Sequence, residues 1–310
     1  YKFCSHFKFL FIHITHESIL LLCFRHLKNS VIEGLYLNTS DGCREFENKL
    51  PQNICQEYKN ISTILTATAY DANKYCQNAF QYALWPCIID KQTFSRVTRE
   101  RVFLTSLYAA FLTLKGAEWC SVGKIGNCPK NTRDASCFVK FGSLLAKAYL
   151  FFETYGIQDP VGGVLSHSIN FGILIVQRSL GQACKCYGIS GACCIKTCWF
   201  VLPSYTHITF ELKKYYEDSI HWDSNSLRPA KELKKLKNKL VYLDYSNDYC
   251  NKTKNRRCNN EESCFYVCCG KKYFSVEAYY NKYRCDCTWK ESLVLKCKVC
   301  TTKTQVYTCE

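Results

Sequence analysis

One short run of the sequence, CKCYGISGACCIKTCW at residues 184–199, constrains the fold more than any other. Its cysteines are nested on both sides of a single serine, Ser190, and Gly188 and Gly191 supply the backbone freedom that a tight turn requires. Cysteines that flank a turn in this way can close it into a small covalent ring. The pattern therefore predicts a rigid hairpin with a hydroxyl at its tip, which suits presentation to another protein better than burial in a core.

Two pairings would build this hairpin. A bridge between Cys186 and Cys193 would close the loop and remove roughly 2–3 kcal/mol of denatured-state entropy in the chain-entropy estimate. A bridge between Cys184 and Cys198 would brace the stem beneath the loop. The serine would then lie at the end of a covalently braced stem.

The cysteine content of the whole chain indicates an oxidising compartment. The 310 residues contain 24 cysteines, an even number, and 15 of them lie after residue 180. Such a density is typical of a disulfide framework in a secreted protein. A zinc protein is the alternative, but Cys297-Lys-Val-Cys300 is the only Cys-x-x-Cys pair and no histidine follows His221. Structural zinc sites usually need two such pairs or histidine partners, so we expect disulfides and no metal.

Three N-glycosylation acceptor sequences, which begin at Asn38, Asn60 and Asn251, agree with a secretory route through the endoplasmic reticulum. Residues 7–24 are apolar but are interrupted by two histidines and a glutamate. The chain starts at Tyr1 and has no methionine, so we expect a fragment or processed form whose targeting segment is absent or degenerate. No uninterrupted apolar run reaches 18 residues, which argues against a transmembrane helix.

The chain is strongly basic. Its formal net charge is +15, from 41 Lys and Arg against 26 Asp and Glu, and the densest basic cluster lies at residues 228–239. Such a surface attracts anionic polymers, and for a secreted protein the natural polyanion is a sulfated glycan such as heparan sulfate. A solvated basic linker explains the cluster equally well. Nucleic-acid binding is not expected, because the sequence offers neither a recognition helix nor an aromatic-lined sheet.

The organisation of the chain changes near residue 220. Helical periodicity before this point predicts helices over 20–37, 96–119, 141–155, 168–180 and 210–216. Gly162 and Gly163 predict a loop before the fourth of these. From residue 240 onward, short strands are predicted over 240–245, 285–289 and 294–297.

These patterns predict an α+β fold in three parts. A helical N-terminal domain at 1–222 carries the disulfide-braced hairpin at 184–198, and a basic linker follows at 223–239. A small cystine-rich domain at 240–310 contains a second hairpin at 285–300. A domain of this length can bury only a small hydrophobic core. Its disulfide bridges must therefore supply most of its stability.

The run around Ser190 resembles the lipid-attachment hairpin of the Wnt family of secreted signalling proteins, which reads C-K-C-H-G-[VIL]-S-G-S-C-x-x-[KR]-T-C-W. The chain departs from this pattern at Tyr187, where the family has His, and at Ala192, where a second Ser is usual. The resemblance extends over nearly the whole chain. Thr98-Arg-Glu100 matches the family's T-R-E, and residues 240–250 (LVYLDYSNDYC) are similar to L-V-Y-L-E-x-S-P-D-[FY]-C.

The resemblance implies recognition rather than catalysis. Ser190 would carry a mono-unsaturated acyl ester, attached by a Porcupine-type acyltransferase, and the chain would need no other cofactor. Ser190 and Ile189 on the first hairpin would contact the cysteine-rich domain of a Frizzled-type receptor. Trp289, Leu293 and Leu295 on the second hairpin would contact its opposite face. A lipoprotein-receptor-related co-receptor, and a carrier during secretion to the extracellular space and matrix, complete the implied partners.

The resemblance also implies nine disulfides. They are Cys43–Cys55, Cys120–Cys128, Cys184–Cys198, Cys186–Cys193, Cys250–Cys269, Cys258–Cys264, Cys268–Cys309, Cys285–Cys300 and Cys287–Cys297. The cysteines without a family partner are Cys4, Cys23, Cys76, Cys87, Cys137 and Cys194. Cys76 and Cys87 are candidates for a bridge private to this chain.

Two alternatives remain open from the sequence. The tip of the second hairpin has Ser292 and Leu293 where the family has adjacent cysteines, so the chain could be an unlipidated secreted binding protein that does not signal. The run Gly188-Ile-Ser190-Gly-Ala192 nearly matches the esterase motif G-x-S-x-G but fails at Ala192. The candidate general bases are His167, His207 and His221, and none of them lies in a motif that would pair it with Ser190. We therefore expect no catalytic site.

Overall fold

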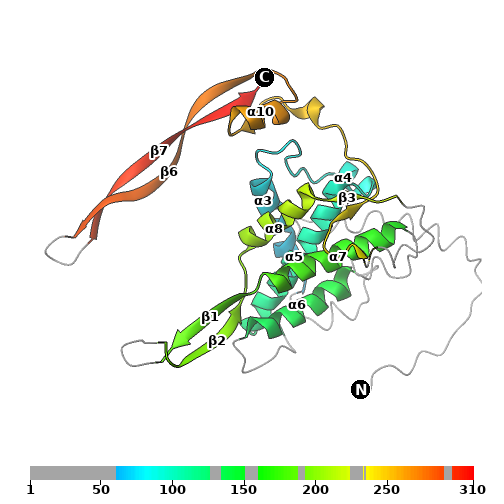
Figure 1. Ribbon diagram of the computed structural model, residues 1–310, viewed down its shortest axis with the longest axis vertical. Helices are drawn as coiled ribbons and strands as arrows, with labels where there is room; N and C mark the ends of the chain where they lie inside the picture. The colour runs from blue at the N-terminus through cyan, green and yellow to red at the C-terminus, as the bar shows by residue number, and fades with distance from the viewer. Residues whose placement is uncertain are drawn as a thin grey trace, which may run out of the picture.

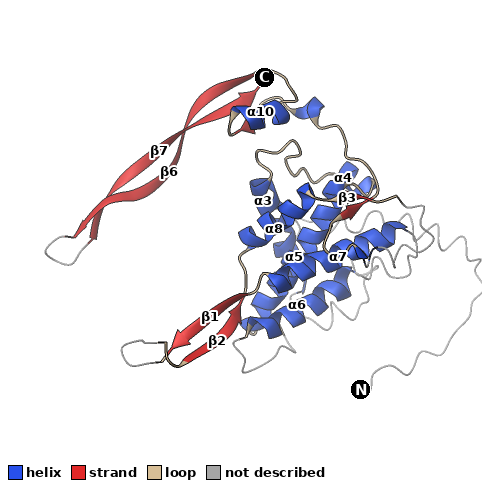
Figure 2. Cartoon of the chain, in the orientation of Figure 1, coloured by secondary structure: helices blue, strands red, loops and turns tan. Residues whose placement is uncertain are grey.

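The computed structural model describes residues 61–125, 134–150, 160–187, 193–223, 233, 235–289 and 295–310. A bundle of helices fills the centre of the molecule, and two β-ribbons project from it (Figures 1 and 2). The helices of the bundle are α3 (Ile61–Ala79), α4 (Lys91–Ser95), α5 (Arg99–Ser121), α6 (Ala135–Leu150), α7 (Pro160–Arg178) and α8 (Tyr205–Glu217). The first ribbon consists of β1 (Gly181–Cys186) and β2 (Lys196–Val201), inserted between α7 and α8. The α+β class expected from the sequence is confirmed.

Helix α5 is the centre of the bundle. It begins after Thr98, whose hydroxyl accepts a hydrogen bond from the backbone N–H of Arg101 at 3.4 Å. Most of its residues are buried, because α3, α6, α7 and α8 surround it. A helix enclosed on all sides needs apolar residues on all sides, which explains why its sequence shows no polar face. The expected helix over 96–119 is therefore present at nearly the expected bounds.

Two glycines let neighbouring helices approach α5 closely. A Cβ added at Gly142 of α6 would lie 2.1 Å from the carbonyl oxygen of Thr113, and one added at Gly172 of α7 would lie 2.0 Å from that of Ser106. The Ser106 hydroxyl also donates to the carbonyl of Ser168 at 2.8 Å, which ties α5 to α7. The bundle is thus packed backbone against backbone at these points.

The loop after α3 is anchored in the same core. A disulfide joins Cys76 to Cys87, so the private bridge suggested by the sequence is present. Between these cysteines, Trp85 is 2% exposed and packs against Phe80, with ring centroids 5.0 Å apart. Phe103 of α5 and Tyr216 of α8 complete this aromatic cluster. Helix α3 itself had no counterpart among the expected helices.

Helix α7 begins earlier than its sequence suggested. The predicted loop at Gly162 and Gly163 is wrong, because both residues lie in the first turn of the helix, where Gly163 faces the buried Leu233. Among the described residues, α7 is the one helix long and apolar enough to cross a membrane by length and composition, and half of that stretch is buried. Its packing against α5 accounts for this apolar character.

The segment after α8 stays on the helical bundle. The predicted strand over 240–245 is shorter than expected, since only β4 (Val241–Tyr242) is extended, and it pairs in parallel with β3 (Ile220–His221). Val241 and Leu233 are buried against valines of the bundle, so this stretch packs with the helices and not with the cystine-rich strands that follow. The proposed domain boundaries stay a prediction, and half of the basic cluster at 228–239 lies outside the described residues.

The cystine-rich module follows as a short helix and a three-stranded sheet. Its elements are η3 (Cys250–Lys252), β5 (Arg257–Cys258), α10 (Glu261–Val267), β6 (Tyr273–Trp289) and β7 (Leu295–Cys309). Asn260 caps α10 in a capping box with Ser263. The strand order is β5-β7-β6, and β6 and β7 extend far beyond β5 as a two-stranded ribbon. They are much longer than the short strands expected at 285–289 and 294–297.

Two braced hairpins form the candidate binding site

Strands β1 and β2 form the stem of the first hairpin. They are antiparallel, and their register places Cys184 directly opposite Cys198. The two are joined by a disulfide with Cα atoms 4.0 Å apart, and a second disulfide joins Cys186 to Cys193 with Cα atoms 4.7 Å apart. The first separation suits directly opposed residues of antiparallel strands, whereas the second bridge crosses beyond the ladder, because Cys186 is paired with Lys196 and Cys193 lies in the turn before β2. The nested pairing expected from the sequence is therefore present.

The loop that this stem carries, residues 188–192, lies outside the described residues, and so do Ser190 and Ile189. The structure defines both ends of the loop. The backbone N–H of Tyr187 donates to the carbonyl of Ile195 at 2.8 Å, which extends the ladder one step beyond the strands. The Cys186–Cys193 bridge then holds the last described residues on each side together. Any group on the loop is consequently displayed at the end of a fixed stem.

The end of the stem exposes apolar surface. Tyr187 is 53% exposed and Ile195 is 68% exposed, and the two face each other across the ladder. The ammonium of Lys185 lies 5.4 Å from the centre of the Tyr187 ring. Cys194, beside them, is an exposed free thiol, and Cys137 on α6 is also free. This end of the hairpin offers a partner both apolar contacts and a positive charge.

A polar cluster joins three helices of the bundle where the chain leaves the first hairpin. The hydroxyl of Tyr205, four residues beyond β2, donates to Glu118 at 2.9 Å. Burial, together with that carboxylate, raises the pKa of Tyr205, so its hydroxyl keeps its proton and remains a donor. Lys115 lies 4.6 Å from the centre of the Tyr205 ring and pairs with Asp71 at 2.7 Å. Sequence reasoning missed this cluster, because its members come from α3, α5 and α8.

Strands β6 and β7 form the second hairpin. Disulfides Cys285–Cys300 and Cys287–Cys297 link the two strands toward the tip. Leu295 is 46% exposed and lies opposite Trp289 in the ladder, whereas Leu293 lies outside the described residues. The ribbon has irregular register between Cys285 and Thr288, where Asp286 has a positive φ of 46°. In Figure 1 both hairpins extend from the body of the molecule toward the same side of the view.

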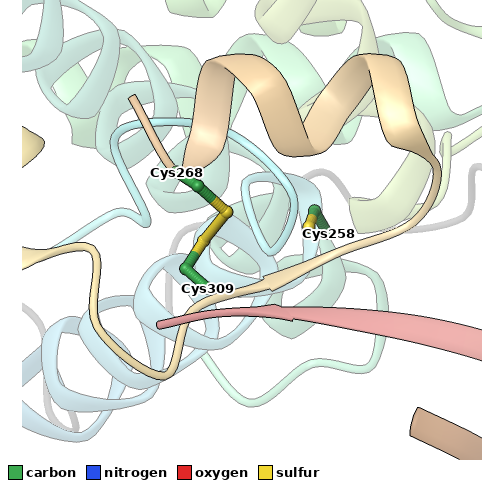
Figure 3. A group of neighbouring side chains, drawn as sticks. All are labelled: Cys258, Cys268 and Cys309. Atoms are coloured by element: carbon green, nitrogen blue, oxygen red, sulfur yellow. A yellow bond between two sulfur atoms is a disulfide. The ribbon is translucent and has the colours of Figure 1, made fainter. Parts of the chain in front are cut away.

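Three disulfides hold the base of this ribbon: Cys250–Cys269, Cys258–Cys264 and Cys268–Cys309. The sulfurs of Cys258, Cys268 and Cys309 lie within 4.8 Å of one another (Figure 3). Metal binding by cysteine requires thiolates, and all three sulfurs are already oxidised in bridges. The cluster is therefore a pair of neighbouring crosslinks in the fully buried centre of the module.

The remaining expected sites are only partly described. Asn251 is exposed in η3, and Thr253 of the same acceptor sequence is buried and donates to the carbonyl of Cys250 at 3.2 Å. Asn38, Asn60 and the pair Cys43–Cys55 lie outside the described residues. Cys120 is disulfide-bonded, but its expected partner Cys128 also lies outside them.

The three histidines considered as catalytic bases lie next to backbone groups or on the surface of a helix. The Nε2 atom of His167 lies 2.8 Å from the carbonyl of Lys239, and that of His221 lies 2.9 Å from the carbonyl of Leu243. Burial lowers the pKa of His167. His207 is an exposed residue in the first turn of α8, next to the cap Ser204.

A helical bundle that carries two disulfide-braced hairpins defines the structural class of this cystine-rich protein. Comparison with known proteins names its family: the Wnt family model matches residues 44–310, so the chain belongs to the Wnt family. It is 27% identical to Wnt-4 of Drosophila melanogaster over 288 residues, which cover 83% of this chain and 53% of that protein. It is 26% identical to Wnt-9b of Mus musculus over 291 residues, which cover 83% of this chain and 81% of that protein.

The fold is similar to that of a solved relative. A chain in the structure of human WLS in complex with WNT8A matches with a TM-score of 0.60 and 25% identity, over 81% of this chain and 96% of that chain. The chain thus spans about half the length of the fly relative but nearly all of this solved chain.

Proposed function

We propose that this chain is a secreted signalling ligand, and not an enzyme, that binds the cysteine-rich domain of a Frizzled-type receptor. The observation that carries the proposal is the covalently braced stem of β1 and β2, whose two nested disulfides display the loop containing Ser190. In this proposal Ser190 carries a mono-unsaturated acyl chain, which enters an apolar groove on the receptor. Ile189 and the exposed pair Tyr187 and Ile195 add apolar contact around it.

The acyl chain would dominate the binding energy. At about 0.8 kcal/mol per buried CH₂, a chain of roughly a dozen methylenes offers on the order of 10 kcal/mol before the costs of association. The second hairpin would add a smaller contact through Trp289, Leu293 and Leu295. Because Ser292 and Leu293 replace the adjacent cysteines of the family pattern at this tip, we expect its receptor preference to differ from that of typical members.

The lipid also requires partners during export. We propose a Porcupine-type acyltransferase in the endoplasmic reticulum and a membrane carrier for secretion, in line with the WLS complex of the solved relative. A lipoprotein-receptor-related co-receptor would complete the signalling complex. Exposed cations along the second hairpin would favour retention on heparan sulfate in the matrix: Lys282, Arg284, Lys296 and Lys298. N-linked glycans are proposed at Asn38, Asn60 and Asn251.

Metabolic labelling with a clickable fatty acid in secreting cells tests the proposal. We expect label on the wild type, none on Ser190→Ala, and normal label on Thr197→Ala, which removes an exposed hydroxyl from the stem of the same hairpin. The label should resist neutral hydroxylamine, because an oxygen ester survives this treatment and a thioester at the exposed Cys194 does not.

A wild type that is secreted, correctly bridged and unlabelled would contradict the lipid model. It would favour an unlipidated binding protein that does not signal. Two changes in the hairpin make this a specific alternative, since Tyr187 and Ala192 replace the His and Ser of the family pattern. Receptor activation by Ser190→Ala at the wild-type level would also contradict the lipid model, because signalling would then not require an acyl chain on this serine.

A further inference from the structure

One arginine joins the cystine-rich module to the helical bundle. Nη1 of Arg256 donates to the carbonyl of Leu84 at 2.5 Å, and Nη2 donates to the carbonyl of Ala83. The guanidinium is half-buried in this position. It is charged at every physiological pH, so both hydrogen bonds are charge-assisted, and its planar fork suits two neighbouring acceptors.

The acceptor side of this joint is held rigidly. Leu84 and Ala83 lie in the loop that the Cys76–Cys87 disulfide closes. The next residue, Trp85, is buried in the aromatic cluster of the bundle. The two carbonyls therefore cannot move far without breaking a crosslink or displacing a core side chain.

The donor side is held as firmly. The backbone N–H of Arg256 donates to the carbonyl of Thr253 at 3.0 Å, and its own carbonyl accepts from the N–H of Cys309 at 2.9 Å. Because Cys309 is the last residue of β7, the arginine backbone is bonded directly to the base of the second hairpin. Two disulfides flank it in sequence: Cys250–Cys269 and Cys258–Cys264.

We propose that this joint, Arg256 seated on residues 83–84, sets the separation between the tips of the two hairpins. The second hairpin acts as a lever, because β6 contains 17 residues and a strand of this length extends for roughly 50 Å. A rotation of about 10° at its base would therefore move its tip by roughly 10 Å. The first hairpin continues directly into the bundle helices α7 and α8, and Tyr205 ties the start of α8 to Glu118 of α5, so the joint lies on the path that connects the two hairpins.

The consequence for recognition rests on the proposed function. Once one hairpin has bound a receptor domain, binding of the other is intramolecular, and its effective concentration is highest when the spacing of the tips matches the spacing of the two contacts. A joint that fixes the spacing raises this effective concentration without touching the receptor. Arg256 is in this sense a positioning residue.

The distance between the hairpins tests the joint directly. Bioorthogonal side chains at the exposed positions Thr197 on β2 and Thr302 on β7 would carry spin labels, because a thiol-directed label would also react with the free Cys194 and could disturb the disulfides. Pulsed electron paramagnetic resonance on the full chain then gives the distribution of distances. We expect one narrow distribution for the wild type and for Lys254→Gln, which removes an exposed charge from the same loop. Thr302 lies roughly 23 Å along β7 from Cys309 at the base of the ribbon, so a rotation of about 10° would move it by roughly 4 Å. Arg256→Gln should therefore broaden the distribution or shift it by roughly 4 Å.

A second variant loosens the acceptor side without changing the arginine. Cys76→Ser combined with Cys87→Ser should broaden the same distribution. Distributions that stay narrow and unshifted in both variants, or one that is already broad in the wild type, would overturn the proposal.

Receptor affinity separates this proposal from the proposed function. For an isolated Frizzled-type cysteine-rich domain, we expect Arg256→Gln to bind about tenfold more weakly than Lys254→Gln. Equal affinity despite a broadened distance distribution would refute the positioning role. If no variant binds the domain, wild type included, the proposed function fails, and the distance measurement still decides whether the joint sets the spacing.

Discussion

Replacing Gly172 by alanine tests whether α7 truly packs with its backbone against α5. The new Cβ would lie 2.0 Å from the carbonyl oxygen of Ser106, and 2.8 Å and 3.0 Å from its carbonyl carbon and Cα. Real Cβ contacts essentially never fall below 3.0 Å, and these atoms are backbone atoms inside a buried helix, so they cannot turn aside. The two helices would have to separate by about 1 Å.

The size of the effect follows from what this separation disturbs. Overpacking a core typically costs about 1–3 kcal/mol. Stretching the hydrogen bond from Ser106 to the carbonyl of Ser168 adds about 1 kcal/mol. The higher helix propensity of alanine returns about 1 kcal/mol. We therefore expect Gly172→Ala to lower the free energy of unfolding by about 1–3 kcal/mol and the melting temperature by roughly 2–10 °C.

The same helix supplies a matched control in Gly163→Ala. There the new Cβ would meet only the end of the Leu233 side chain, at 3.3 Å. A flexible side chain can adjust, so this variant should be as stable as the wild type or more stable by up to about 1 kcal/mol. Denaturation followed by circular dichroism, with disulfides intact, compares the two. Equal unfolding midpoints would refute the close packing of α5 and α7.

Three further outcomes are expected. Burial lowers the pKa of His167, so as the pH falls the unfolded chain takes up a proton before the folded chain does. The contribution of neutral His167 to stability should therefore be complete above about pH 6.5 and be lost as the pH drops below it. In His167→Gln, the melting temperature should change less between about pH 7.5 and 5.5 than it does in the wild type. Glu100 is 1% exposed, and its carboxylate accepts a hydrogen bond from the Tyr216 hydroxyl at 2.9 Å. Glu100→Gln should therefore lower the free energy of unfolding by about 1–3 kcal/mol in a denaturant titration. An unchanged unfolding midpoint would show that this carboxylate does not stabilise the fold. Asn251→Gln and Thr253→Ala should both prevent glycosylation at Asn251, which an increase in mobility on a gel detects. Only Thr253→Ala should also lower the unfolding midpoint, since the side chain of Thr253 is buried.

Local pattern and family resemblance predicted different parts of this molecule. The helix predicted over 96–119, which is α5, was readable from the periodicity and apolar character of its sequence alone. Disulfide connectivity was not readable in this way. Beyond the two bridges of the first hairpin, it came from the resemblance, and the pairs Cys250–Cys269 and Cys268–Cys309 are both present.

The errors arose where distant parts of the chain meet. Gly162 and Gly163 suggested a loop, because local propensity does not show that the helix packs against Leu233, which lies far along the sequence. The strand predicted over 240–245 is in fact the short β4, which pairs with β3 on the helical bundle. Local sequence pattern could not show this, because β3 lies on the other side of the basic segment and the pattern carries no information on which strands pair. The joint at Arg256 was invisible for the same reason, since a lone arginine does not reveal that its acceptors are two backbone carbonyls.

The crosslinks of the second hairpin have a consequence for how this protein can diverge. Cys285–Cys300 and Cys287–Cys297 fix the register of β6 and β7 before the chain reaches the tip. The pairing of the two strands is thereby set on the near side of the segment between Trp289 and Leu295. Under the proposed function, substitutions in that segment would alter which partner is recognised while the body of the protein folds as before. New specificity is thus expected to evolve through a few residues at the end of this hairpin, because the disulfides hold its strands in register.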